Sequence, residues 1–489
     1  MKTINKFLIS VVILTISACG FLDEQPDNRV ELDNLEKSAQ LLVSGYSVAS
    51  PNFTDWMTDD VTWTLGTNIR LEHEQMFRWE EVDAGGPTVI DTPDFYWFET
   101  YNAIAHANEV LAILDGLPVE SPEDEARKDA IEGEALLIRA YGHFMLVNMF
   151  AEHFDSQTSG SDDGIPYIKD PETEFLVGYE RESVRKVYNE IEDDLLKGLR
   201  LVDDSFYANS GKYHFTRNAA LAFATRFYLY QRDYAEVIRY ADQMLGANPA
   251  AFVRDLTSDQ FRNASSSITE YPQIYSSPDQ GGNLLLMRKI SLVQRVDFAF
   301  GVDRNEYSGL FNLNPFANTV TDRRENPAFV KGENALYPVR YQSLFERASL
   351  NANVGFPYYI HIAFTGEEVL LNRAEAKVIT GDNQGAINDL QILINNRYDG
   401  GDITLSLESL ENLFRIGDDF LNVINYVIIE RQKEFLMQGM RWFDLKRFGF
   451  SVQHDSPFGS DILTADDLRK VLQIPESAQE VGGLEANPR

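Results

Sequence analysis

Apolar residues recur at the three- and four-residue spacing of amphipathic helices along most of the chain. The clearest stripe lies in residues 127–150 and is formed by Ile131, Ala135, Ile138, Gly142, Met145 and Met149. Similar patterns predict helices near 35–48, 97–115, 183–201, 217–231, 234–246, 366–380, 383–397 and 420–439. Strand signals are weak and short. The pattern therefore predicts a mainly α fold with few short strands.

Two stretches have the spacing of degenerate tetratricopeptide units, which are helix–turn–helix repeats. The first places Tyr228, Asp233 and Pro249 at the characteristic positions, and the second places Gly381-Asp382 at the turn, with Asp382 four residues before Ala386. About 150 residues separate the two units, so a simple tandem array is excluded. We expect helix pairs that are scattered along the chain and interrupted by long loops.

Residues 51–96 and 251–340 carry few long apolar periodicities and are rich in Gly, Pro, Asn, Asp and aromatic residues. Loops of this length inside a compact domain are usually functional or disordered, and a high aromatic content argues against disorder. We therefore expect these two segments to carry the functional site.

The N-terminus has the features of a secretory signal. Lys2 and Lys6 precede ten mostly apolar residues, a run that is too short to span a membrane. Ser17 and Ala18 follow, directly before Cys19, which is the single cysteine of the chain. The sequence Ile-Ser-Ala-Cys resembles the lipobox of bacterial lipoproteins, in which the cysteine is lipidated; the alternative is an ordinary signal with a chance cysteine. A multiply acylated Cys19 would anchor the protein stably.

The composition argues against a disulfide-stabilised fold and against a nucleic-acid partner. A chain with one cysteine forms no internal disulfide, so 44% hydrophobic residues must supply the core. The formal net charge is −33, and loss of Lys2 and Lys6 with the signal lowers it to −35. Such a surface repels phosphate backbones, so no nucleic-acid partner is expected.

Signatures of catalysis and of metal binding are absent from the sequence. No His-Glu-x-x-His, Gly-x-Ser-x-Gly or Walker motif occurs, and we expect no cofactor and no metal. Residues 155–164 are acidic and suggest calcium, but Pro166 stands where an EF-hand needs a bidentate glutamate. We interpret this stretch as a polar loop.

The densest local motif is ERQKEFLMQGMRWFDLKRFG, residues 430–449. Taken alone, it predicts a packed helix end with Arg–carboxylate pairs. It also resembles the C-terminal signature of the SusD/RagB family, surface lipoproteins of Bacteroidetes that capture glycans. Other stretches resemble that family in the same order, namely residues 101–111, 132–150, 371–390 and 472–488, the lipobox and the acidic segment after it. The usual Gln-Asn-Pro-Gly ending is missing.

The resemblance implies a helical fold built on tetratricopeptide-type pairs, with a ligand site in a loop-rich lobe. It implies a lipid-anchored protein at the outer-membrane surface, seated on a TonB-dependent (SusC-like) transporter to which it delivers glycan without catalysis. The expected organisation is a signal peptide (1–18), an acidic tether (19–34), an N-terminal part (35–255) and a C-terminal part (256–489).

The residue types in the two long loops support glycan binding. Sugar rings present an apolar face that aromatic side chains cover, and hydroxyl groups that Asn, Asp and Arg hydrogen-bond. Four of the five tryptophans lie in residues 51–98, and we favour Trp63 and Trp79 because polar loop flanks them. The further candidates are Asn68, Arg70, Tyr96, Tyr275 and Tyr307. The ligand is expected to be neutral.

Three other interpretations stay open at this point. A tetratricopeptide-type scaffold on the outer membrane would explain the helix pairs and the anchor, but not the aromatic loops. A glycoside hydrolase could share the same substrates, although chance carboxylate pairs among 76 acidic residues carry little weight. Capture of a non-glycan nutrient such as a peptide is the third.

Overall fold

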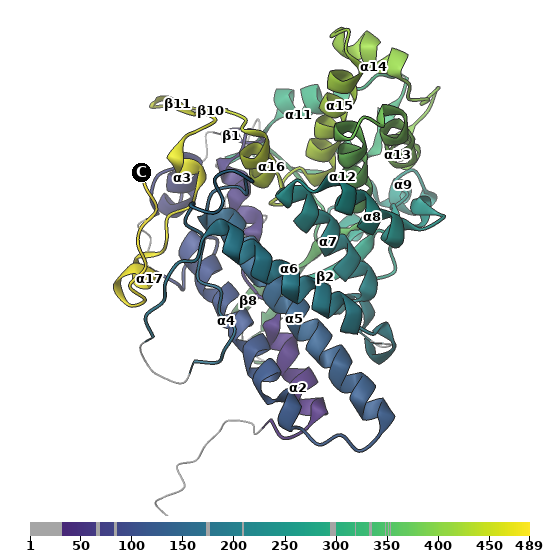
Figure 1. The fold of residues 1–489 in the computed structure, drawn as a ribbon. Helices are drawn as coiled ribbons and strands as arrows, with labels where there is room; N and C mark the ends of the chain where they lie inside the picture. Colours follow the sequence, from purple (N-terminus) through teal and green to yellow (C-terminus); the bar gives the residue numbers. More distant parts are fainter. Residues whose placement is uncertain are drawn as a thin grey trace, which may run out of the picture.

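The computed structural model describes residues 32–489, except 65–68, 83–85, 173–176, 208–209, 294–299, 318, 332–334, 348, 351 and 353. The predicted signal peptide, Cys19, most of the tether and Asn68 lie outside the described residues. Helices dominate the rest of the chain (Figure 1), which confirms the predicted mainly α fold. Within the described part, no helix combines the length and the apolar character needed to cross a membrane.

All nine predicted helices are present, with shifted ends. They are α2 (Leu35–Leu42), α4 (Pro93–Ile113), α5 (Pro122–Phe150), α6 (Val184–Leu201), α7 (Arg217–Gln231), α8 (Tyr234–Leu245), α12 (Gly366–Ile379), α13 (Asn383–Asn395) and α15 (Asp419–Phe435). α5 begins at residue 122, five residues before the predicted start at 127. The Ser121 side chain accepts a hydrogen bond from the Asp124 N–H, and Pro122 occupies the first helical position.

The two tetratricopeptide-type units are α7–α8 and α12–α13, and they pack against each other despite their separation in sequence. Arg226 of α7 forms a buried bidentate pair with Glu368 of α12, at 2.5 and 2.6 Å. Arg373 of α12 contacts Asp242 of α8 at 2.8 Å and also Asp389 of α13. The scattered pairs therefore form one helical body.

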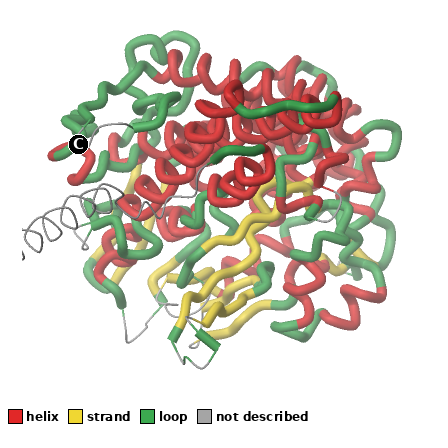
Figure 2. The backbone as a smooth tube through the Cα atoms, turned by 90° about the horizontal axis from the view of Figure 1, so that it is seen from below, coloured by secondary structure: helices red, strands yellow, loops and turns green. Residues whose placement is uncertain are grey.

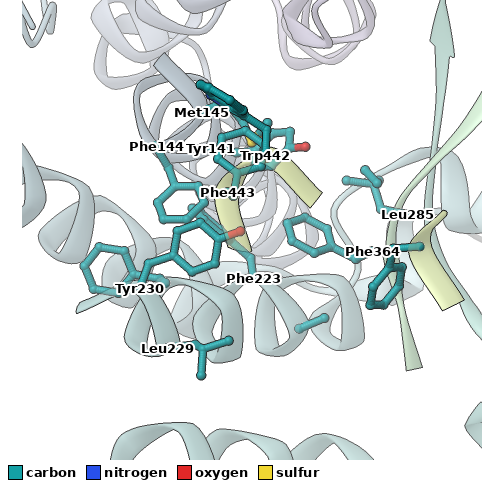
Figure 3. Packing of buried hydrophobic residues seen from close by; sticks show 14 of the residues in the cluster. Tyr141, Phe144, Met145, Phe223, Leu229, Tyr230, Leu285, Phe364, Trp442 and Phe443 are labelled. Carbon is teal, nitrogen blue, oxygen red and sulfur yellow. The ribbon is translucent and has the colours of Figure 1, made fainter. Parts of the chain in front are cut away.

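An aromatic core joins this body to the sheets. Tyr141 of α5, Phe223 of α7 and Phe364 of β8 (Gly355–Thr365) meet with ring centroids 5.2–5.7 Å apart (Figure 3). Phe144 lies beside them, one turn further along α5. These contacts hold the sheet against the helices.

The loop-rich segments contain more regular structure than the pattern predicted. The strands form four antiparallel sheets: β2 (Asn283–Lys289), β8 and β7 (Ser343–Arg347); β1 (Thr62–Trp63), β3 (Phe300–Asp303), β6 (Ala335–Pro338) and β5 (Ala328–Lys331); β10 (Val452–Ser456) and β11 (Gly459–Leu463); β4 (Thr321–Asp322) and β9 (Tyr398–Asp399). Figure 2 shows the strands gathered beneath the helices. The remaining helices are α3 (Leu71–Phe77), α9 (Asp259–Ala264), α10 (Glu270–Tyr275), α11 (Arg304–Asn312), α14 (Leu407–Phe414), α16 (Arg441–Phe448) and α17 (Glu476–Glu480).

A buried ionic network lies on α15 and reaches four other segments of the chain. Arg397 contacts Glu434 of α15 at 2.7 Å and Glu367 of α12 at 2.9 Å, and all three side chains are fully buried. Arg324 contacts Glu430 of α15 at 2.8 Å. Burial alone would raise the pKa of Glu434, but the adjacent guanidinium groups of Arg397 and Arg324 hold it below its usual range.

A second buried ionic cluster lies within the motif at residues 430–449. Arg431 contacts Asp444 of α16 at 3.2 Å, and Arg447 contacts the same carboxylate at 2.8 Å and Glu375 of α12. The Arg–carboxylate pairs expected from the sequence are therefore present, and they tie α15 and α16 to α12.

We expect Arg397→Met to lower the free energy of unfolding by about 3–5 kcal/mol, because it removes the bidentate partner of the buried Glu434 carboxylate and one of the two arginines that pair with Glu367. Urea unfolding at neutral pH measures the change. The matched control is Arg239→Met, which removes a surface partner of Glu236 and should change the value by less than about 1 kcal/mol. Equal effects of the two substitutions would show that the buried network does not stabilise the fold.

Candidate functional site

The two loop-rich segments meet where β1 pairs with β3. Trp63 of β1 lies opposite Phe300 of β3, and Thr62 lies opposite Gly301. The β10–β11 hairpin contacts β1 through β10, and Figure 1 shows β1, α3, β10 and β11 gathered beside the helical body near the C-terminus. Segments that are far apart in sequence thus form one surface.

A continuous series of rings, here called the aromatic run, crosses this surface. It consists of Phe458, Trp63, Phe300, Phe77, His454 and Trp79. Trp63 stands edge-on to Phe300 at 5.2 Å and to Phe458 at 5.9 Å. The His454 ring stacks between Phe77 at 4.1 Å and Trp79 at 4.3 Å. The run therefore connects the two tryptophans that the sequence singled out.

The two ends of the aromatic run differ in their exposure. Phe458, at the turn of the β10–β11 hairpin, is 73% exposed, and Trp63 beside it is partly buried. Trp79 is only 4% exposed, and its indole N–H donates to the Met57 carbonyl at 2.9 Å. Only the Phe458–Trp63 end presents aromatic surface to the solvent.

His454 holds the middle of the run in place. Its two ring nitrogens lie 2.6 Å from the Phe77 carbonyl oxygen and 2.7 Å from the Thr58 carbonyl oxygen. Burial lowers the pKa of His454, while the two carbonyl groups act in the opposite direction. The ring thereby joins β10 to the segment that carries Trp79.

Several carboxylates lie on the strands that carry the run or next to them in sequence: Asp303 on β3, Asp455 on β10 and Asp59 just before β1. Asp59 forms a bidentate pair with Arg441, with both distances at 2.8 Å. Burial and the charges of Asp303, Asp59 and Asp455 raise the pKa of Glu306. Burial and the neighbouring Asp59 raise the pKa of Asp60 to about 7. Asp59 and Glu306 are exposed and can accept hydrogen bonds from the hydroxyl groups of a ligand, whereas Asp60 is buried.

A cavity of about 650 Å³, here called the tail cavity, opens beside Trp79. Its walls are formed by the end of α3, the start of α4 and residues 469–489, here called the C-terminal segment. Its apolar lining consists of Met57, Met76, Trp79, Val82, Pro93, Leu472, Ile474 and Pro475. Its charged lining consists of Glu80, Glu81, Asp94, Glu476, Glu480, Arg469 and Arg489.

The volume of the tail cavity falls in the range of small-molecule sites. Burial raises the pKa of Asp94, and the charges of Glu476 and Glu81 add to the rise. A cavity with an apolar wall and crowded carboxylates suits a ligand that combines apolar faces with hydroxyl donors, and it disfavours anions. Among the described residues, no group of three or more His, Cys, Asp or Glu side chains is placed to hold a metal ion.

The remaining predicted site residues that the structure describes are not among the rings of the aromatic run. Arg70 pairs with Glu72 at 3.0 Å. Tyr96, Tyr275 and Tyr307 are all buried in the core. Packing encloses the three tyrosine rings, so their predicted binding role has no support in this arrangement.

Each enclosed tyrosine has a structural partner. Tyr275 lies 3.9 Å from the Arg254 guanidinium, Tyr96 lies 5.8 Å from Phe53, and the Tyr307 hydroxyl donates to a backbone carbonyl. The sequence placed these tyrosines in or near loop-rich segments, and loop composition does not show whether a ring is buried or exposed.

Sequence reasoning missed Phe458, His454 and the lining from the C-terminal segment. A signal for the first was available, because Ser-Pro-Phe-Gly at 456–459 is a turn sequence between two short alternating stretches. No local signal indicates that residues 469–480 would close a cavity beside Trp79.

Comparison with known proteins gives two family matches. A family model described as starch-binding and associating with the outer membrane matches residues 20–229. A model described as the SusD family matches residues 367–485. A search of curated proteins finds no match.

Solved structures share the fold over nearly the whole chain. A SusD superfamily protein from Bacteroides thetaiotaomicron has a TM-score of 0.67 at 17% identity and covers 93% of this chain and 100% of its own. A SusD-like carbohydrate binding protein from Bacteroides vulgatus has a TM-score of 0.61 at 15% identity, with 92% and 97% covered. A laminarin binding SusD-like protein has a TM-score of 0.59 at 17% identity, with 93% and 99% covered.

We expect the two tryptophans to differ in their effect on stability. Trp79→Ala should lower the free energy of unfolding by about 3–5 kcal/mol, because it empties a buried position and removes the hydrogen bond to Met57. Trp63→Ala should cost about 1–2 kcal/mol, since its ring is only partly buried. Urea unfolding of both variants tests this order, and a larger loss for Trp63→Ala would contradict the assignment.

Proposed function

The chain belongs to the SusD/RagB family, and from this premise we propose that it is a cell-surface protein that binds oligosaccharide or polysaccharide. The observation that carries the proposal is the exposed end of the aromatic run, where Phe458 lies beside Trp63 and the segments that carry the two rings include carboxylates. The carbohydrate-binding and laminarin-binding proteins of the same fold support the proposal.

The geometry of this end fits the chemistry of a sugar ring. An exposed aromatic face covers the C–H face of a pyranose, while neighbouring carboxylates accept hydrogen bonds from its hydroxyl groups. Asp59, held by Arg441, and Glu306 are the candidate acceptors, because both are exposed on segments next to β1 and β3. The surplus of carboxylates favours a neutral glycan over an anionic one.

The family model's description supports association with the outer membrane. We propose that a lipid on Cys19 anchors the protein to the cell surface. Its partner would be a TonB-dependent (SusC-like) transporter, to which it delivers the bound glycan. The protein would act without catalysis, because capture and release require only reversible contacts.

We expect Phe458→Ala to weaken glycan binding about tenfold while leaving the melting temperature nearly unchanged, because the ring is mostly exposed. Isothermal titration with malto- and laminari-oligosaccharides measures the affinity. Phe345→Ala is the matched control, since that ring is 48% exposed on β7, in a different sheet.

Equal affinities of the Phe458→Ala and Phe345→Ala variants would remove the aromatic run from the site. Analysis of the oligosaccharides after incubation separates the remaining interpretations. Cleaved products would indicate a hydrolase, whereas neither binding nor cleavage across the panel would favour a scaffold or a peptide-binding protein.

We expect Cys19→Ala to abolish lipid attachment and to release the protein from membranes, or to leave it unprocessed. Ala18→Gly is the control, because it keeps a small residue before the cysteine. An alkaline wash of isolated membranes, followed by detection of the protein, distinguishes the variants. Retention of Cys19→Ala after the wash would exclude the lipid anchor.

Membranes from cells that express the wild-type protein also test the proposed transporter complex. Gentle detergent extraction of the wild-type protein should recover a TonB-dependent transporter with it. Recovery of the protein alone after crosslinking would count against this partner without affecting glycan binding.

A further inference from the structure

A second cavity, of about 500 Å³, lies beside the C-terminal segment and is here called the polar cavity. The loop after α5, the end of α7, the end of α16 and residues 465–470 line it. Asp467 and Lys470 face this cavity, whereas Arg469 and Leu472 line the tail cavity. No residue lines both cavities, and none of the aromatic run belongs to the polar cavity.

A buried histidine nitrogen in this lining has no partner. Nε2 of His153 is buried and makes no hydrogen bond within the described part of the chain. Burial and the charges of Arg232, Lys446 and Arg447 hold the pKa of His153 well below its usual range, so the ring is neutral. This nitrogen lies beneath the cavity surface, so the histidine ring lines the cavity with its other atoms.

Two lysines in the lining keep unused hydrogen-bonding capacity. Lys446 donates to the carbonyls of Asn148 and Ala151, at 2.7 and 2.8 Å. Lys470 donates to two other carbonyls, at 2.6 and 2.9 Å. Each ammonium group carries three N–H donors, so each retains one beyond these contacts.

The remaining lining combines both charge signs with an aromatic ring. Five carboxylates, from Glu152, Asp155, Asp162, Asp466 and Asp467, face four basic side chains, so neither a cation nor an anion is strongly favoured. Phe448 adds an apolar surface and is stacked on Phe450 at 5.3 Å. Donors, acceptors and an aromatic face together match a polyhydroxylated, uncharged molecule.

We propose that the polar cavity is a second binding site, and that it takes a neutral sugar residue. The free N–H groups of Lys446 and Lys470 would pair with hydroxyl groups, and Phe448 would contact the ring. This site is separate from the aromatic run, so it would give the protein two points of contact with glycan.

A single engineered thiol tests the site, because Cys19 is the only natural cysteine. Thr158→Cys, in the full chain that also carries Cys19→Ser, places a thiol on the exposed wall of the cavity. We expect millimolar maltoheptaose or laminarihexaose to slow alkylation of this thiol by iodoacetamide at least fivefold. Gln157→Cys is the control, since that exposed neighbour does not line the cavity and should react at an unchanged rate.

Further substitutions separate this site from the aromatic run. Protection of the Thr158→Cys thiol should persist when Phe458→Ala is added, and should be lost with Phe448→Leu or Asp162→Ala. Thermal melts identify any variant that has failed to fold. Failure of both glycans to protect the thiol, or loss of protection with Phe458→Ala, would overturn the second site and leave the proposed function standing.

Discussion

The buried charges of α15 are the constraint on which the rest of the structure depends. Glu430 and Glu434 of this helix pair with arginines from distant parts of the chain: Arg324 lies in the loop-rich segment 251–340, and Arg397 lies just beyond α13. Buried charges are tolerated only when they are paired and hydrogen-bonded. These segments must therefore dock on α15 in one register, because a displacement would break the buried pairs. Glu367 extends the same requirement to α12 and so to the helix pairs.

The position of the aromatic run depends on the same docking. Just beyond α15, the N–H of Gly439 donates to both carboxylate oxygens of Asp55, at 2.8 and 3.0 Å. Arg441 then holds Asp59, four residues before Trp63. His454 completes the connection through the carbonyls near Trp79. Residues from the C-terminal part thus place the N-terminal tryptophans, so the site exists only in the folded chain.

The arrangement suits reversible capture of glycan. One exposed ring pair, a cavity with an apolar wall and a rim of carboxylates offer contacts that are individually modest. An aromatic contact contributes roughly 0.5–1.5 kcal/mol beyond its buried area, so a few of them give moderate affinity and easy release. Tighter binding would hinder the delivery that we propose. The strong net negative charge disfavours polyanionic ligands.

The sequence by itself determined the helices, the helix pairs and the Arg–carboxylate motif, because these follow from spacing within a few turns. It also pointed to Trp63, since loop composition is a local property. It did not determine β8, whose second half is buried on both faces and so lacks alternation. Nor could it distinguish the enclosed Tyr275 from the exposed Phe458, because burial depends on which distant segments cover a ring. Only the tertiary structure decided which aromatic rings are covered. It paired β1 with β3, and it placed the C-terminal segment beside Trp79, because both contacts join segments that are far apart in sequence.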